Sequence, residues 1–209
     1  MENRKVKFRS KESNLLALHA IPGHFATSHS HINYYVDVTS IKTRTSEAKE
    51  AGKVLYTKLP KHIYIDTIVC MDGTEMIGAF LSQEIEHAGI MTINRHETLY
   101  VVSPEVNNSQ IIFRDNIVPM IKGKHVLITA VSVASGNTAK AAIEAIKYYG
   151  GEVVGIASIF ATSKKCADLE VNSVFNPKDL PGYFSCPAHE CPLCKEGKKL
   201  DALINCHGF

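Results

Sequence analysis

The fold of this chain is decided by one stretch, HVLITAVSVASGNTAKAAIEAI at residues 125–146. Its first part, residues 126–128, is an apolar and β-branched run that is typical of a buried parallel strand. A turn of small and polar residues follows at 132–138. Apolar residues then recur at helical spacing up to Tyr149, which predicts an amphipathic helix. The stretch therefore predicts one strand–turn–helix unit of an α/β protein.

The turn in this unit has the features of a phosphate-binding loop. A turn that opens a helix presents backbone N–H groups with no partner inside the helix. Ser135 and Thr138 add hydroxyl donors, and Gly136 allows the backbone to approach a ligand closely. An ordinary strand–helix turn, in which Ser135 or Asn137 caps the helix, is also consistent with these residues.

Composition sets bounds on the class of protein. The chain has 209 residues, 45% of them hydrophobic and 21% charged, which suffices for one well-buried α/β domain. A net charge of +2 is too small to indicate nucleic acid or an acidic membrane surface. The polar start predicts no signal peptide, and no apolar run reaches the length of a membrane span. We therefore expect a cytoplasmic protein with neither a nucleic-acid nor a membrane partner.

Propensity and spacing predict further elements along the chain. We expect a helix at 14–21 that ends at Pro22-Gly23, and a strand at 34–38. The rest of the chain predicts helices after Thr45-Ser46, at 76–88 and at 114–124, with strands at 63–70, 91–94, 98–102 and 152–160.

This arrangement resembles the type I phosphoribosyltransferases, and orotate phosphoribosyltransferase in particular. On the family's motif for phosphoribosyl pyrophosphate (PRPP), the loop that holds the 5′-phosphate falls on Ala134, Ser135, Gly136, Asn137 and Thr138. The two acidic residues that hold the ribose hydroxyls in the family fall on Ala130 and Val131. The segment from Gly23 to Asp37 is similar to the family's N-terminal segment, with His29 and Ser30 in place of its glycine and lysine.

The resemblance implies an architecture. It is an α/β fold with a central, mostly parallel sheet flanked by helices and a small hood built from N- and C-terminal segments. We expect residues 1–185 to form this domain, with the hood from parts of 1–45, and residues 186–209 to form a Cys-rich tail. The resemblance also implies a homodimer.

A second turn, at Asp72, Gly73 and Thr74, falls where the family carries its pyrophosphate loop. Gly73 supplies a flexible turn and Thr74 is a helix-capping residue type. Asp72 and Glu75 add negative charge, which opposes anion binding unless Mg²⁺ intervenes. The alternative is a plain turn whose acidic residues favour the N-terminus of the next helix.

Two further segments depart from the family. The mobile catalytic loop of orotate phosphoribosyltransferases is rich in Lys, Arg and His, whereas residues 103–110 contain no basic residue. An arginine that reads orotate in the family has no counterpart after the strand at 152–160, where Lys164 and Lys165 are the nearest cations. The first difference removes the charge that would stabilise a departing pyrophosphate. At the second, Lys164 or Lys165 could replace the charge of the arginine but not its bidentate geometry, which argues against orotate as the ligand.

Four of the six cysteines, Cys186, Cys191, Cys194 and Cys206, lie in the last 24 residues. Cys191 and Cys194 form a CxxC pair at zinc-binding spacing, with His189 and His207 as further candidate ligands. One interpretation is therefore a structural Zn²⁺ ion held by these four cysteines. The alternatives are a tail that binds no metal and a redox-active dithiol. His24, His29 and His31 lie close together on a predicted loop and could be read as metal ligands, but no carboxylate or cysteine stands at matching spacing, so we expect them to be solvated loop residues.

Three functional hypotheses follow. The first is transfer of phosphoribosyl from PRPP to a nitrogenous base with Mg²⁺. The second is binding of a phosphorylated ribose ligand, PRPP or a nucleotide, without turnover, as in a sensor or regulatory protein. The third is an inactive subunit whose role lies in its dimer surface.

Overall fold

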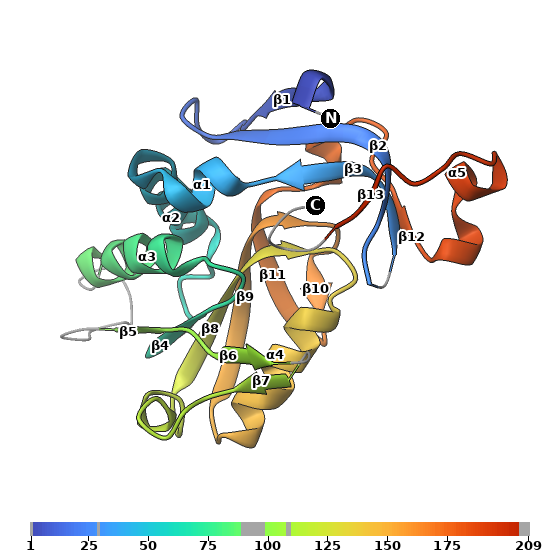
Figure 1. Ribbon diagram of the computed structural model, residues 1–209. Helices are drawn as coiled ribbons and strands as arrows, with labels where there is room; N and C mark the ends of the chain where they lie inside the picture. The colour runs from blue at the N-terminus through green and yellow to red at the C-terminus, as the bar shows by residue number, and fades with distance from the viewer. Residues whose placement is uncertain (1, 29, 89–98, 108–109, 205–209) are drawn as a thin grey trace.

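The computed structural model describes residues 2–28, 30–88, 99–107 and 110–204. Within these residues a six-stranded sheet forms the centre, and a smaller sheet lies above it as a hood (Figure 1). No helix of the described part is long and apolar enough to cross a membrane. The α/β class with a mostly parallel central sheet is confirmed.

The central sheet follows the order β10-β11-β9-β8-β4-β5. Its pairs are parallel, except that β10 runs antiparallel to β11. The strands are β4 (Thr67–Cys70), β5 (Tyr100–Val102), β8 (His125–Val133), β9 (Glu152–Ala161), β10 (Lys165–Cys166) and β11 (Leu169–Phe175). The apolar run at 126–128 is fully buried, as expected for a strand covered on both faces.

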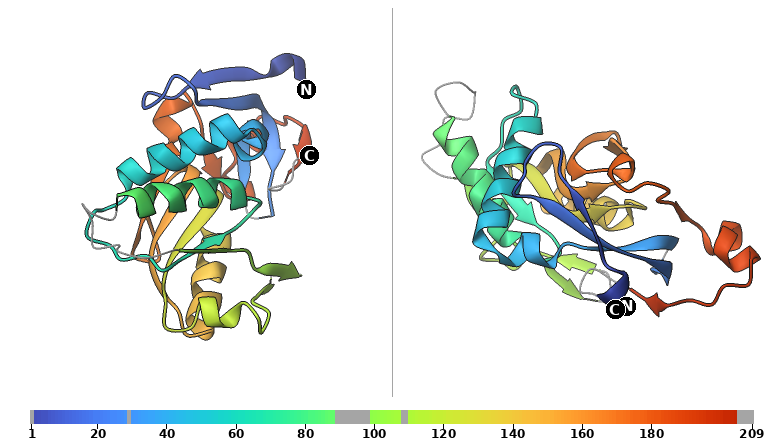
Figure 2. Two further views of the ribbon diagram at one scale, coloured as in Figure 1. Left: turned by 90° about the vertical axis from the view of Figure 1, so that its left-hand side faces the viewer. Right: turned by 90° about the horizontal axis from the view of Figure 1, so that it is seen from above.

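Helices cover both faces of this sheet (Figures 1 and 2). The helices are α1 (Thr39–Thr43), α2 (Thr45–Lys58), α3 (Glu75–His87) and α4 (Asn137–Tyr148). Leu55 of α2 and Leu81 of α3 share one buried cluster with Ile68 of β4. Ala142 and Ile146 of α4 share a second cluster with Ile128 of β8. The two clusters divide the core into one layer on each side of the sheet.

The hood combines segments from both ends of the chain. It contains β1 (Val6–Arg9), β2 (Ala17–Ala26), β3 (His31–Asp37), β12 (Ser185–Cys186) and β13 (Ala202–Leu203). β12 pairs with β3, and β13 runs parallel to β2. Between them, η4 (Ala188–Glu190) and α5 (Pro192–Lys195) project to one side (Figure 2). The expected separation of a domain at 1–185 from a tail at 186–209 stays a prediction.

Short elements complete the described structure. They are η1 (Glu2–Arg4), η2 (Val118–Met120), η3 (Pro177–Asp179) and the hairpin strands β6 (Glu105–Asn107) and β7 (Gln110–Ile112). The predicted helix at 114–124 is reduced to η2 and turns. The strand expected at 63–70 begins only at Thr67. The strand expected at 91–94 lies outside the described residues.

The helix predicted at 14–21 is wrong, because this segment begins the long strand β2. A short apolar run does not distinguish a strand from a buried helix, and here pairing with β1 and β3 decides the outcome. Pro22-Gly23 does not end the element. The pairing of β2 with β3 instead shifts register between Pro22 and Phe25, which accommodates both residues.

Candidate functional site

The topology places a crevice between β4 and β8. From β4 the chain continues to β5 on one side, whereas from β8 it continues through β9 to β11 on the other. In open α/β sheets, ligands bind at such a reversal, beyond the carboxyl ends of the strands. The turns that follow these two strands are residues 71–74, which contain the predicted turn at 72–74, and residues 134–136, which are the centre of the predicted turn at 132–138.

A cavity of about 510 Å³ occupies this position, below the hood. Its lining combines the turn after β8, one residue of the turn after β4, α1 and the inner side of β3. The lining residues are Thr27, Ser28, Ser30, Ile32, Tyr35, Val36, Val38, Thr39, Lys42, Thr43, Asp72, Val131, Ser132, Ala134, Ser135, Gly136, Asn137, Thr138, Ala139, Phe160, Tyr183 and Ile204.

All five residues of the predicted phosphate loop line this cavity. Gly136 has φ +77°, and a Cβ there would lie 2.9 Å from the Cys166 Sγ, so this position requires glycine on two grounds. Asn137 begins α4, and the first-turn N–H groups of a helix have no intrahelical acceptor. Ser135 and Thr138 are exposed beside them. The loop therefore offers backbone and hydroxyl donors at the positive end of a helix dipole.

The two positions of the family's acidic pair are buried and apolar. Ala130 is 5% exposed and Val131 is 6% exposed. Ala130 belongs to the cluster under α4, whereas Val131 belongs to the cluster on the opposite face and also borders the cavity. Hydrocarbon therefore occupies both places where the resemblance would put a sugar-binding carboxylate.

The turn at 72–74 divides its residues between the cavity and the core. Asp72 has φ 57° and borders the cavity. Thr74 is 1% exposed, and its hydroxyl donates to the Met71 carbonyl oxygen at 2.8 Å and lies 2.9 Å from the Thr129 hydroxyl. Its side chain makes no cap for α3. Among the three candidates for the pyrophosphate loop, Asp72 alone faces the cavity.

Lys42 is a cation of the cavity lining that the sequence analysis does not single out. It lies on α1, and its Nζ donates to the Asp72 carbonyl oxygen at 2.9 Å. Among the described residues that line the cavity, Lys42 is the single lysine or arginine. No motif surrounds it, because its position depends on β3 ending next to the turn after β4. It supplies positive charge to the cavity that the phosphate loop also lines.

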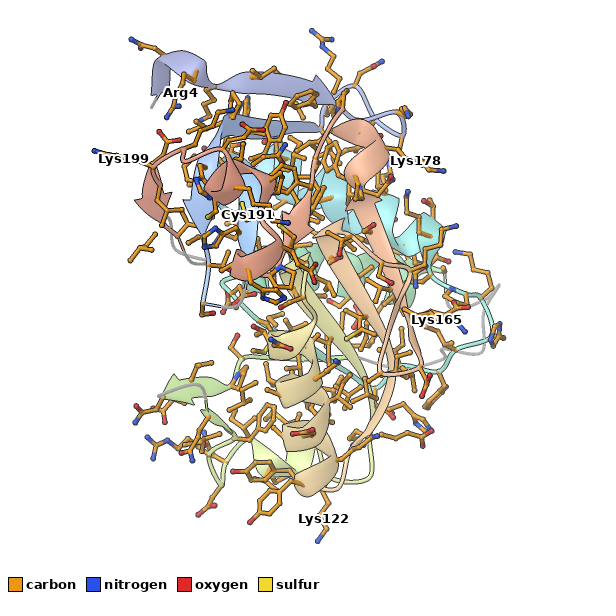
Figure 3. All side chains as sticks on the ribbon, turned by 90° about the vertical axis from the view of Figure 1, so that its right-hand side faces the viewer. Arg4, Lys122, Lys165, Lys178, Cys191 and Lys199 are labelled. Carbon is orange, nitrogen blue, oxygen red and sulfur yellow. The ribbon has the colours of Figure 1, made fainter. Side chains whose placement is uncertain are left out.

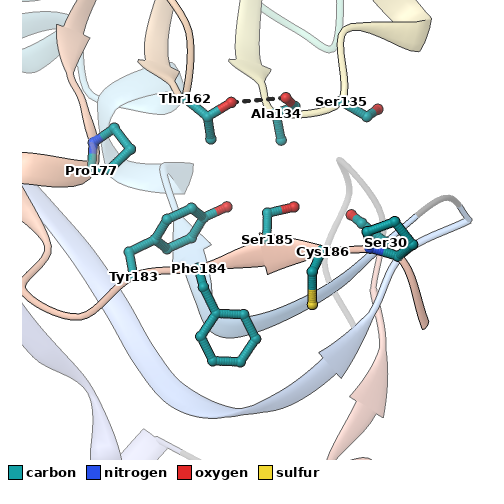
Figure 4. A pocket seen from close by; sticks show the side chains of 10 residues that line it. Ser30, Ala134, Ser135, Thr162, Pro177, Tyr183, Phe184, Ser185 and Cys186 are labelled. Carbon is teal, nitrogen blue, oxygen red and sulfur yellow. Dashed lines mark hydrogen bonds between the residues drawn. The ribbon is translucent and has the colours of Figure 1, made fainter. Parts of the chain in front are cut away.

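A second cavity of about 470 Å³ adjoins the first and shares Ser30, Ala134, Ser135 and Tyr183 with it. Figure 4 shows Tyr183 and Ser185 directed toward the phosphate loop, where the Thr162 hydroxyl donates to the Ala134 carbonyl oxygen at 2.8 Å. Burial raises the pKa of Tyr183 to about 12. The phenol therefore stays protonated and remains a hydrogen-bond donor at neutral pH.

The segment that corresponds to the family's catalytic loop forms the β6–β7 hairpin. Its Glu105 forms an ion pair with Arg114, the first basic residue after the hairpin. Lys164 and Lys165 are exposed, and neither is among the residues that line the two cavities. Figure 3 shows Lys165 well away from the hood. The described structure therefore brings none of these three cations to the cavities.

Two of the four predicted zinc-binding cysteines come together with two histidines. Ligand atoms of His24, His31, Cys191 and Cys194 all lie within 4.8 Å of one another. Cys186 pairs with His31 across β12 and β3 but is outside this group, and Cys206 lies outside the described residues. The expectation of solvated histidines is wrong for His24, which is 3% exposed on β2. His29 also lies outside the described residues.

The cavity also permits a test of the Mg²⁺ that the resemblance implies. Asp72 is the single carboxylate among the described lining residues, since Ala130 and Val131 offer none. Mg²⁺ sites commonly use one or two protein carboxylates together with the phosphates of the ligand. Asp72 therefore fits as the one protein ligand of a Mg²⁺ ion whose other ligands would include the oxygens of a bound pyrophosphate group.

The fold is that of the type I phosphoribosyltransferases. The structure is similar to an orotate phosphoribosyltransferase of Mycobacterium tuberculosis in complex with inorganic phosphate, with TM-score 0.52 and 18% identity over 71% of this chain and 80% of that one. An adenine phosphoribosyltransferase of Thermoanaerobacter pseudethanolicus has TM-score 0.52 and 16% identity over 68% and 88% of the two chains. These likenesses establish the fold.

Sequence comparison identifies the family within this class. The orotate phosphoribosyltransferase of Thermotoga maritima is 30% identical over 181 residues, which are 84% of this chain and 86% of that protein. That of Heliobacterium modesticaldum is 26% identical over 203 residues, 91% of this chain and 90% of that protein. No family model matches the chain. The chain belongs to the orotate phosphoribosyltransferase family.

Proposed function

We propose that this chain binds a phosphorylated ribose compound, PRPP or a nucleotide, and does not transfer its phosphoribosyl group. The observation that carries this proposal is that all five residues of the predicted phosphate loop, 134–138, line one cavity, while the positions of the acidic pair hold the buried, apolar Ala130 and Val131. The loop supports ligand binding, and the apolar pair argues against catalysis. The protein then acts as a sensor or regulatory subunit rather than as an efficient enzyme.

The binding half of this proposal rests on complementary charge. The 5′-phosphate accepts hydrogen bonds from the first turn of α4 and from the Ser135 and Thr138 hydroxyls. Lys42 adds a cation on the opposite wall. Tyr35 and Tyr183 offer polar and aromatic contacts for the remainder of the ligand. The similar Mycobacterium tuberculosis enzyme was seen with inorganic phosphate, which agrees with this assignment.

The proposed lack of transfer is argued from groups that transition-state stabilisation would need. Phosphoribosyl transfer develops positive charge on the ribose and releases a highly charged pyrophosphate, and both changes require fixed charges nearby. Ala130 and Val131 provide no carboxylate for the sugar. The described part of the β6–β7 hairpin adds no unpaired cation for the pyrophosphate, since Glu105 binds Arg114.

Calorimetry and a pyrophosphate-release assay test the two halves separately. We expect PRPP, ribose 5-phosphate and orotidine monophosphate to bind, and no pyrophosphate release with orotate or other bases in the presence of Mg²⁺. The Thermotoga maritima relative provides a positive control for the assay. Release at a rate comparable with that relative would contradict the catalytic half, and absence of binding by all three ligands would contradict the whole proposal.

Asp72 provides a second prediction, which concerns Mg²⁺. Its carboxylate repels a pyrophosphate group in the absence of metal and supplies a ligand when Mg²⁺ is present. Asp72→Asn keeps the φ 57° conformation, which asparagine tolerates, and removes the charge. We expect PRPP to bind the variant about threefold to tenfold more tightly than the wild type without Mg²⁺.

The same titrations with Mg²⁺ complete this test. We expect Mg²⁺ to strengthen binding of PRPP by the wild type and to have a much smaller effect on the Asp72→Asn variant. Ribose 5-phosphate, which lacks the pyrophosphate, is the matched ligand control and should respond to neither change. An equal Mg²⁺ response in the two proteins would show that Asp72 takes no part.

Phosphoribosyl transfer is the second candidate function. It is favoured by Lys42 and Asp72, which face the phosphate loop across one cavity, as a pyrophosphate site would require. Transfer would need Mg²⁺ held by Asp72 and the ligand's own oxygens. The pyrophosphate-release assay distinguishes this candidate from binding alone. The homodimer that the resemblance implies stays a prediction under either function.

A further inference from the structure

We propose that His24, His31, Cys191 and Cys194 bind one Zn²⁺ ion, which fastens the C-terminal segment to the β2–β3 hairpin of the hood. The four residues come from two segments that are 160 or more positions apart in the sequence. Figure 3 shows Cys191 inside the C-terminal segment, beside the hood strands. The proposal is independent of any ribose ligand.

The distances within the cluster are close to those of a tetrahedral zinc site, except that the two imidazole nitrogens lie closer together than they would around a bound ion. His24 Nε2 lies 3.0 Å from His31 Nδ1, 3.5 Å from the Cys191 Sγ and 3.6 Å from the Cys194 Sγ. Cys194 Sγ lies 3.3 Å from His31 Nδ1. Ligands at the corners of a tetrahedron, with Zn–N of about 2.0 Å and Zn–S of about 2.3 Å, are separated by about 3.3 to 3.8 Å.

Hydrogen bonding alone does not account for this arrangement. The Nε2 atom of a neutral imidazole can donate one hydrogen or accept one, yet three ligand-type atoms converge on His24 Nε2. A single cation at the centre satisfies all four groups at once. Two thiolates and two neutral imidazoles are a common ligand set of structural zinc.

A hydrogen bond on the far side of the His24 ring directs its other nitrogen toward the cluster, as a zinc ligand requires. His24 Nδ1 lies 2.9 Å from the Lys198 carbonyl oxygen, which can only accept a hydrogen bond. The proton is therefore on Nδ1, and the Nε2 lone pair is directed to the cluster. The His24 backbone N–H donates to the Asp201 carboxylate at 2.8 Å. Both partners belong to the segment that the metal would fasten.

The site lies close enough to the cavity to organise part of its wall. Thr27, Ser28 and Ser30, at the tip of the β2–β3 hairpin, line the cavity between the two histidines in the sequence. Ile204, shortly after β13, lines it as well, and its N–H donates to the Ala26 carbonyl oxygen at 2.9 Å. A metal that joins these segments would hold both against the phosphate loop.

Metal analysis of the full chain, purified without chelators or metal-affinity resin, tests the proposal. We expect about one zinc ion per chain, the stoichiometry of a single four-ligand site. Cys194→Ser and His31→Gln should each lose most of the metal. Because Cys194 is exposed, its replacement removes little packing, and the variant is expected to fold.

Two control variants define the ligand set. His189→Ala removes an exposed histidine of the same segment, and Cys186→Ser removes a nearby thiol outside the cluster. Both should retain the zinc. Replacement of zinc by Co²⁺ should give the intense visible bands and the thiolate charge-transfer band of a tetrahedral site with sulfur ligands, and Cys194→Ser should weaken the latter.

Trypsin provides a readout of the fastening itself. Lys195, Lys198 and Lys199 lie in the segment after the CxxC pair. Removal of the metal by a chelator should accelerate cleavage there several-fold, and added Zn²⁺ should restore protection. The proposal would be overturned by purified chain with almost no zinc that takes up none, by an oxidised Cys191–Cys194 pair in the native chain, or by unchanged zinc in the Cys194 and His31 variants.

Discussion

Replacing Ser135 with glutamate is expected to abolish binding of ribose 5-phosphate and PRPP, with at least a tenfold loss of affinity, because like charges at close range repel strongly. Ser135 lies in the loop that opens α4 and borders both cavities. The introduced carboxylate would occupy the helix N-terminus that otherwise receives the phosphate. Isothermal titration calorimetry measures the loss directly.

Ser46→Glu is the matched control for this experiment. Ser46 is also an exposed serine near the start of a helix, α2, but it is not among the residues that line the two cavities. The control should bind both ligands as the wild type does. Unchanged affinity in the Ser135→Glu variant, with thermal stability equal to that of the wild type, would place the phosphate elsewhere.

Ala130→Asp is expected to lower the free energy of unfolding at pH 7 by about 3 kcal/mol or more, since it buries a charge without a partner. Ala130 is 5% exposed, and its neighbours in the cluster under α4 include Ala139 and Ala142. The substitution restores a residue type of the family's acidic pair. We therefore expect it to damage the fold rather than to create an enzyme.

The pH dependence of this loss identifies its cause. Burial would raise the pKa of the introduced carboxyl above its value of about 3.9 in the unfolded chain. The penalty is then largest above the raised pKa and shrinks as pH falls through it, because the folded state takes up a proton there; it is smallest below about 3.9, where the unfolded chain is protonated as well. Ala130→Asn, which has a similar shape and no titrating group, should show a loss that is nearly independent of pH.

Urea unfolding of the wild type and both variants at pH 7 and near pH 4.5 measures these differences, each relative to the wild type at the same pH. A constant difference between the Asp and Asn variants at the two pH values would contradict a buried charge. It would indicate that the position opens to solvent, and the apolar pair would then be a weaker argument against sugar binding.

Much of the fold could be predicted from the sequence because its signals are local. Helices α2 and α3 carry long apolar faces, and β8 and β9 are mostly apolar, so the pattern indicates their type. The helix predicted at 14–21 failed because β2 is defined by its neighbours in the hood. The residue propensities of an eight-residue segment do not reveal which strands it will pair with.

The candidate sites, too, could be predicted only where their residues are adjacent in the sequence. The phosphate loop is contiguous in the sequence, and its five residues line one cavity. Lys42 and the His24–His31 pair depend on contacts between distant segments, so spacing gave no sign of Lys42 and favoured Cys186 over the histidines. The CxxC pair is a usable signal for half of the proposed zinc-binding group. The other half, His24 and His31, lies on a predicted loop with no cysteine or carboxylate at matching spacing.

The packing of Ala130 has a consequence for the history of this protein. In a lineage that once carried a carboxylate there, later changes under α4 that fill space around a methyl group would make the loss hard to reverse. A single reversion would then meet a core that no longer has room for it. A carboxylate at this position then requires several coordinated substitutions in the cluster under α4 rather than one.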